Sequence, residues 1–224
     1  MLRILFLLTT IILSTTLSAA TFNKFGKVEE VKYRPVNSPL PFLYDVIYYI
    51  PKKLEGKKNL KTLVFLHGGG ASTSDRAGSM RVTRMYFGDM KKLADELGVV
   101  MVAPSGSGLN WGGHMLAYLE DLVETLKKDL SIDPNSIGLT GHSMGGMGIT
   151  RSYQWLTDEF AFFMPVAAGM DVKHFKKEYL STIFNTTYYH LQGLKDHFRV
   201  FVERVKLQDI EMLALESEYG KKSG

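Results

Sequence analysis

The sequence predicts an α/β fold in which helices cover both faces of a mostly parallel β-sheet. Continuous apolar runs recur at residues 62–66 and 99–103, and such runs are typical of strands buried on both faces of a parallel sheet. Segments with helical spacing of apolar residues separate these runs, and alternating strands and helices build a sheet with crossover helices. The length of 224 residues fits one such domain.

The first twenty residues, Met1–Ala20, predict a secretory signal peptide. Arg3 gives a positive start, Ile4–Leu17 is apolar, and Ser18-Ala19-Ala20 is a small-residue cleavage site. The apolar run is short for a membrane span of about 20 residues, although an uncleaved anchor is the alternative. We therefore expect a secreted or periplasmic protein with one α/β domain over residues 21–224 and no membrane association after cleavage.

Composition excludes several classes of site. The chain has no cysteine, which rules out disulfides, a cysteine nucleophile and thiolate metal sites. Its six histidines show no metal-binding spacing, so neither a metal nor a cofactor is predicted. The formal charge of +4 is not concentrated in one stretch, so no nucleic-acid partner is expected.

Two strands precede the parallel part of the predicted sheet. Residues 28–33 and 44–50 are rich in Val, Ile and Tyr, and the segment Pro35–Pro41 separates them. They can pair as antiparallel edge strands. The later strands are expected at residues 136–139, 160–168 and 186–191, with a turn at Asp133-Pro134 before the first of them.

Helical spacing of apolar residues predicts four helices. They are expected at Met80–Leu97, His114–Leu130, Met147–Leu156 and Phe198–Tyr219. Gly98 and Gly220 follow the first and last of them, where glycine commonly ends a helix.

A pentapeptide with the nucleophile-elbow pattern, Gly141-His142-Ser143-Met144-Gly145, lies between a predicted strand and a predicted helix. The turn must be so tight that only glycine fits two positions on either side of the serine. Ser143 would then project above the sheet edge as a nucleophile, and the Met144 N–H would supply half of an oxyanion hole. A glycine-rich turn without chemistry is the alternative.

A second glycine motif, His67-Gly68-Gly69-Gly70, directly follows a predicted buried strand. In esterases such a loop donates the second oxyanion N–H, which we assign to Gly69. A flexible turn is the alternative, and a phosphate-binding P-loop would need a following Gly-Lys-Ser/Thr that is absent here. His67 is expected to orient the loop by hydrogen bonding and not to act as a base.

Three further residues lie at the predicted ligand edge of the sheet. Trp111, in the loop after the strand at 99–103, can either form a wall of the substrate site or pack its loop against the domain. Asp171 and Asp196 each follow a predicted strand end and are candidates for the acid of a catalytic triad. We prefer Asp196, for which a helix cap or a loop role is the alternative.

With these motifs in order, the sequence resembles the α/β-hydrolase superfamily. Within it, the chain is similar to secreted esterases grouped with polyhydroxybutyrate depolymerases and feruloyl esterases, also through Asp129–Ile137 and Phe160-Ala161-Phe162. The resemblance covers about Tyr44–Asp196. It implies a three-layer sandwich, Ser143 as nucleophile and Asp196 as acid, in the order Ser, Asp, His.

The triad histidine should follow one more strand after the last helix, but only Lys221-Lys222-Ser223-Gly224 remain. The resemblance therefore implies that the final strand and its histidine loop are missing. His142, His197 and His114 are weak substitutes, because none has the expected position. A serine hydroxyl needs such a base within hydrogen-bond reach.

The function expected from the resemblance is a secreted serine carboxylic-ester hydrolase that acts on a small or polymeric ester through an acyl-enzyme. Two alternatives stay open. One is a truncated or degenerate homologue that does not turn over substrate. The other is a module that binds a polymer through the glycine loop and Trp111. Oligomeric state is left open.

Overall fold

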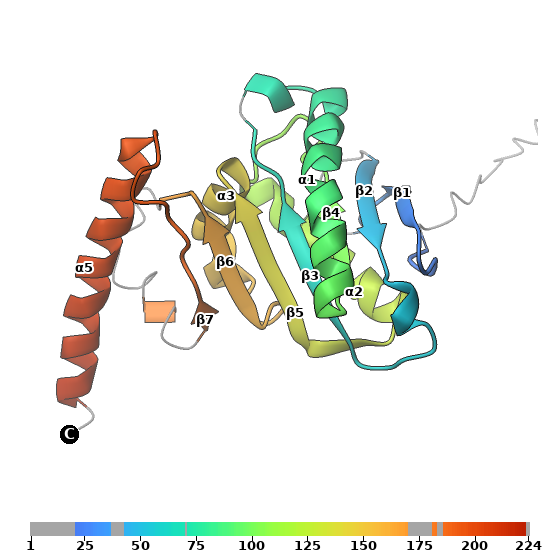
Figure 1. Ribbon diagram of the computed structural model, residues 1–224. Helices are drawn as coiled ribbons and strands as arrows, with labels where there is room; N and C mark the ends of the chain where they lie inside the picture. Colours follow the sequence, from blue (N-terminus) through green and yellow to red (C-terminus); the bar gives the residue numbers. More distant parts are fainter. Residues whose placement is uncertain (1–20, 37–42, 70, 170–180, 183–185, 223–224) are drawn as a thin grey trace, which may run out of the picture.

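The computed structural model describes residues 21–36, 43–69, 71–169, 181–182 and 186–222. The predicted signal peptide and the candidate Asp171 lie outside these residues. A seven-stranded sheet with the order β1-β2-β4-β3-β5-β6-β7 forms the centre of the fold (Figure 1). Its strands are β1 (Val28–Tyr33), β2 (Tyr44–Tyr49), β3 (Leu60–Leu66), β4 (Val100–Pro104), β5 (Ile132–His142), β6 (Phe162–Val166) and β7 (Thr187–Tyr188).

The directions of the strands confirm the predicted mixed sheet. The antiparallel part comprises β1 and β2, and β2 joins the rest of the sheet by antiparallel pairing with β4. From β4 to β7, neighbouring strands are parallel. Because the carboxyl ends of parallel strands meet at one edge, the loops after β3, β4, β5 and β6 gather there.

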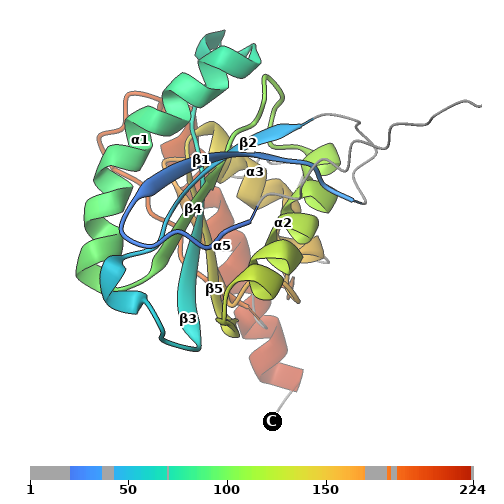
Figure 2. The ribbon, with the colours of Figure 1, turned by 90° about the vertical axis from the view of Figure 1, so that its right-hand side faces the viewer.

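Helices cover both faces of the sheet, as the sequence predicts. They are α1 (Arg76–Leu97), α2 (Leu116–Asp129), α3 (Met144–Ser152) and α5 (Arg199–Lys222). Figures 1 and 2 show α1 on one face, α2 and α3 on the other, and α5 beside β7 at the sheet edge. Two buried apolar clusters fill the layers, one on the α1 side and a larger one beneath α2 and α3.

The first helix illustrates how local signals set the boundaries. It begins earlier than predicted because the Asp75 carboxylate accepts a hydrogen bond from the Gly78 amide (2.6 Å), which caps the helix. It ends at the predicted residue, Gly98, whose φ of 67° lies in the left-handed region. Glycine reaches that region without steric cost.

Several predicted boundaries differ from those in the structure, and three of the differences have clear physical reasons. Asp133-Pro134 lies within the bounds of β5 and does not precede it, but a register irregularity leaves it unpaired with β3, and the Asp133 carboxylate accepts from the Asn135 amide (3.0 Å) as in a local turn. The last helix runs through Gly220 to Lys222, because a glycine inside a helix costs only about 1 kcal/mol and does not end it by itself. The strand predicted at 186–191 is reduced to Thr187–Tyr188 plus an isolated bridge between Leu191 and Val166.

Within the described residues, no helix combines the length and the apolar character needed to cross a bilayer.

Candidate active site

Ser143 occupies a strained turn between β5 and α3. Its φ of 52° and ψ of −112° lie outside the regions that side-chain-bearing residues prefer, and such conformations typically cost about 1–3 kcal/mol. Two backbone hydrogen bonds hold the turn: Ser143 N–H donates to Val166 O (2.9 Å), and Met147 N–H donates to Ser143 O (2.8 Å). The serine is half-buried, so it lies at the surface of the packed core and not within it.

Glycines make this turn sterically possible. A β-carbon at Gly145 would lie 2.1 Å from the Leu66 carbonyl oxygen, and one at Gly141 would lie 2.8 Å from the Gly145 carbonyl carbon. Any side chain at these positions would push the strand ends and α3 apart. The elbow therefore depends on direct main-chain contact between β3, β5 and α3.

The triple-glycine loop lies against the elbow. Gly68 is buried, and a β-carbon there would lie 3.1 Å from the carbonyl oxygen of His142. Gly69 is exposed and lies against Thr73, whose hydroxyl donates to the Met144 sulfur at 3.9 Å. Gly69 and Met144, the two predicted oxyanion donors, are thus neighbours of the same threonine.

His67 is fully buried and both of its ring nitrogens are occupied. Its Nε2 accepts the Gly106 amide proton (2.9 Å), so Nδ1 must carry the ring proton, and it donates to Gly68 O (2.7 Å). Burial also lowers the pKa of His67. A neutral imidazole with both nitrogens in use holds the loop and cannot take a proton from Ser143.

Trp111 packs its loop against the domain. The side chain is 2% exposed, and its Nε1–H donates to the His67 carbonyl oxygen (2.9 Å). A β-carbon at Gly148 of α3 would lie 2.3 Å from the Trp111 Cβ. Of the two alternatives for Trp111, these contacts favour packing over a substrate wall.

Asp196 lies in the turn after β7, at the same edge as the elbow. Its carboxylate accepts hydrogen bonds from the Phe198 amide (2.9 Å) and from Gln192 Nε2 (2.9 Å), and these donors lower the pKa of Asp196. The carboxylate also interacts electrostatically with His142. The predicted acid therefore lies within electrostatic range of His142, the residue that precedes Ser143.

Neither His142 nor His197, two of the histidines considered as bases, has the expected geometry. His142 is half-buried and its Nδ1 is engaged by the Tyr86 hydroxyl (2.7 Å). The His197 ring is 84% exposed and lies 3.7 Å from the Asp196 carboxylate. The His114 side chain lies outside the described part. Among described residues, the Ser143 side chain makes no capping hydrogen bond to α3, while both ring nitrogens of His67 and Nδ1 of His142 are bonded to other groups.

Burial lowers the pKa of His142, and the Asp196 carboxylate partly opposes this effect. The partner of His142, Tyr86, was not singled out by the sequence. Tyr86 lies inside the helix predicted at Met80–Leu97, on a face that carries both polar and apolar residues. No sequence pattern connects it to a residue 56 positions later.

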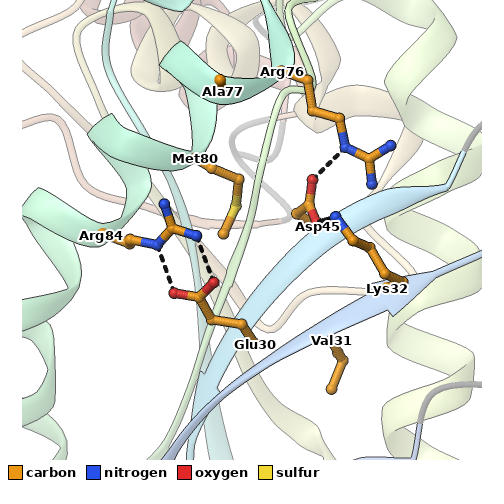
Figure 3. Close-up of a pocket in the computed structure, with 8 residues that line it drawn as sticks. All are labelled: Glu30, Val31, Lys32, Asp45, Arg76, Ala77, Met80 and Arg84. Atoms are coloured by element: carbon orange, nitrogen blue, oxygen red, sulfur yellow. Dashed lines mark hydrogen bonds and ion pairs between the residues drawn. The ribbon is translucent and has the colours of Figure 1, made fainter.

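A cavity of about 500 Å³ lies away from the elbow, between α1 and strands β1 and β2 (Figure 3). Ion pairs line it: Arg84 contacts both carboxylate oxygens of Glu30 at 2.6 Å, and Asp45 accepts from Arg76 (2.5 Å) and Lys32. These pairs tie the β1–β2 edge to α1. Among described residues, no three His, Asp or Glu side chains gather as a metal site.

No family model matches the chain. A curated relative, the bifunctional acetylxylan esterase/xylanase XynS20E of Neocallimastix patriciarum, is 28% identical over 126 residues. The alignment covers 54% of this chain and 17% of that protein, so the chain matches a small part of its relative.

Solved esterase structures share the fold. A thermostable esterase superposes with a TM-score of 0.65 at 18% identity, covering 84% of this chain and 52% of that one. The feruloyl esterase module from Clostridium thermocellum gives 0.64 at 15% identity, with 83% and 72% covered. A ferulic acid esterase gives 0.62 at 16% identity, with 88% of each chain covered. The chain therefore has the α/β-hydrolase fold.

Proposed function

We propose that the chain is a serine hydrolase of the carboxylic-ester type. The observation that carries this proposal is the strained φ of Ser143 at a glycine-enclosed turn between β5 and α3. Such strain persists only where surrounding structure imposes it, and it clusters at functional sites. A turn that only connects a strand to a helix does not require a strained backbone.

In the proposed reaction, the Ser143 oxygen attacks the ester carbonyl while a base takes the hydroxyl proton. The amides of Met144 and Gly69 bind the oxyanion of the tetrahedral intermediate. Collapse of this intermediate expels the alcohol and leaves an acyl-enzyme, which water hydrolyses to the free acid. Asp196 would orient the base and stabilise its protonated form.

The names of the similar proteins support a proposal for the substrate class. Acetylxylan and feruloyl esterases recur among the similar proteins, so we propose small acyl esters carried by a plant polysaccharide, as free fragments or on the polymer. The signal-like residues 1–20 support a secreted or periplasmic location. This location suits a substrate outside the cell.

The direct test is hydrolysis of a chromogenic acetyl ester and of acetylated and feruloylated xylan by wild type and Ser143→Ala. Loss of a triad nucleophile typically costs about 10⁶-fold in kcat, so the variant should fall to background. The unfolding midpoint of the variant should match that of wild type. Equal hydrolysis by both proteins would remove Ser143 from the reaction.

A second candidate function is binding without turnover. It is favoured by one observation, that both ring nitrogens of His67 and Nδ1 of His142, the histidines that flank the glycine loop and the elbow, are bonded to groups other than Ser143. A fluorophosphonate reagent separates the two candidates, because it modifies an activated serine once and needs no turnover. Stoichiometric labelling with sustained hydrolysis supports the hydrolase. Retention of acetylated xylan without labelling or hydrolysis, unchanged in Ser143→Ala, supports binding alone.

A further inference from the structure

Tyr86 on α1 and His142 at the end of β5 form a hydrogen-bonded pair that the proposed reaction does not use. The Tyr86 hydroxyl lies 2.7 Å from His142 Nδ1, and the two rings are 5.6 Å apart between centroids. The Tyr86 ring also rests on Phe65 of β3, at 5.3 Å between centroids. The pair therefore connects α1, β3 and β5 next to the turn that carries Ser143.

Gly68 lies against both members of this pair. A β-carbon there would lie 3.0 Å from His142 Nδ1 and 3.1 Å from the Tyr86 hydroxyl oxygen. The loop that carries Gly69 thus packs against both atoms of the hydrogen bond. On the other side of the bond, His142 precedes Ser143 and lies two residues before Met144. The hydrogen-bonded pair is therefore in contact with the glycine loop and covalently continuous with the elbow, the two segments that carry the proposed oxyanion donors.

Burial keeps both partners of this hydrogen bond neutral, and which of them donates depends on the tautomer of His142. Burial raises the pKa of Tyr86, so its hydroxyl keeps its proton at neutral pH. Burial lowers the pKa of His142, so its ring is neutral. A half-buried donor and acceptor that face each other hold their side chains in one orientation.

We propose that the Tyr86–His142 hydrogen bond is a positioning device that sets the spacing between the Gly69 and Met144 amides. The inference rests on the proposed function and deepens it, because it assigns two positioning residues to that same site. Neither residue takes part in bond making. Since a displacement of about 1 Å at a reacting centre can cost about 100-fold in rate, loss of the hydroxyl should appear in kcat.

The first test removes one oxygen atom. Tyr86→Phe should lower kcat for a chromogenic ester, and the rate of Ser143 labelling by a fluorophosphonate, by about ten- to a hundredfold, with KM changed by less than about twofold. The matched control is Tyr33→Phe. Tyr33 makes a comparable hydrogen bond to Thr125 Oγ1 (2.9 Å) far from the elbow, so its loss should reduce the unfolding midpoint alone.

The second test changes the histidine side of the bond. His142→Asn keeps an oxygen or nitrogen near the position of Nδ1, whereas His142→Leu removes it. The asparagine variant should therefore retain more labelling activity than the leucine variant. In the Tyr86→Phe background this difference should vanish, because the two groups act as one unit and their effects do not add.

Three outcomes would overturn the inference. Tyr86→Phe and Tyr33→Phe could lower kcat and the labelling rate equally, or Tyr86→Phe could change only KM or the unfolding midpoint. The third is that the effects of Tyr86→Phe and the His142 variants on the labelling rate add. If Tyr86→Phe does not fold, the comparison of His142→Asn with His142→Leu decides by the same labelling assay. Wild-type activity in Ser143→Ala would overturn the proposed function instead. A wild-type protein whose Ser143 resists labelling and that hydrolyses no ester would overturn both.

Discussion

The elbow and the β7–α5 region differ in how they hold their candidate catalytic residues. At the elbow, β5 pairs with β3 on one side and with β6 on the other, and glycines allow main-chain contact in the turn. At the other end of the sheet, β7 pairs with β6 at only two positions. The nucleophile is thus fixed by packing from several elements, whereas Asp196 depends on a turn and two hydrogen bonds.

Exposure shows the same contrast. Buried apolar side chains surround β5 and β6, and Leu139 and Phe163 are both fully buried. On α5 and the segment between β7 and α5, large apolar side chains face solvent: Tyr189, Leu191, Leu194, Phe198, Val200, Leu207, Ile210 and Leu213. The free energy of unfolding should therefore depend on the elbow half of the sheet and respond weakly to changes near Asp196.

The largest effect is expected for a methyl group at the elbow. Gly145→Ala places a β-carbon 2.1 Å from a main-chain oxygen, which only backbone movement can relieve, so it should destabilise by about 4 kcal/mol or more. Gly193→Ala, beside Asp196, meets no atom within 4 Å and should change stability by less than about 0.5 kcal/mol. Urea unfolding measures both. Similar costs would refute the contrast between the two regions.

A smaller effect is expected for truncated aromatic side chains. Phe163→Ala removes a fully buried ring from β6 and should cost about 3–5 kcal/mol. Tyr189→Ala removes a ring that is 59% exposed and should cost less than about 1 kcal/mol. Thermal unfolding followed by circular dichroism compares them. A large cost at Tyr189 would mean that the β7 edge contributes more than its burial indicates.

The smallest effect concerns the opposite edge, where ion pairs tie β1 and β2 to α1. Burial disfavours the Asp45 carboxylate, but hydrogen bonds from Arg76 and Lys32 outweigh this and lower its pKa below the unfolded value. The stabilisation is therefore present above about pH 4, the usual range of an aspartate carboxyl, and is lost as the pH falls through the lower folded pKa.

Asp45→Asn tests this edge, because it removes the charge and keeps the shape. At pH 7 it should cost about 1–2 kcal/mol, since the partners are partly exposed and solvent screens them. At pH 2 the difference in urea unfolding between wild type and variant should shrink. A difference that is independent of pH would show that charge at Asp45 does not tie this edge to α1.

Local patterns predicted the centre of the fold better than its periphery. Residues 62–66 and 99–103 are continuous apolar runs because their strands are covered on both faces, and this burial is what the pattern records. The elbow was predicted because the residues that define it, Gly141–Gly145, are consecutive in the sequence. Tyr86 was not predicted, because its role depends on a contact with His142 across 56 residues, which no local periodicity encodes.

The errors have a related cause. Asp133-Pro134 resembles a turn in composition, but β5 pairs with β3 on both sides of it, at Ile132 and at Ile137, so it becomes an irregularity inside the strand. The segment at 186–191 has strand-like composition, yet β6 pairs with only part of it. The position of Trp111 after a strand indicated either of two roles, and only the three-dimensional contacts with His67 and Gly148 distinguish them.

The bonding of His67 has a consequence for how substrate preference can diverge. Its ring and carbonyl group join the glycine loop to Gly106 and Trp111 of the following loop. A substitution that reshapes this second loop would therefore also shift the amide of Gly69. Substitutions that change the substrate preference but preserve the rate of attack by Ser143 should therefore accumulate in segments that make no hydrogen bond to His67.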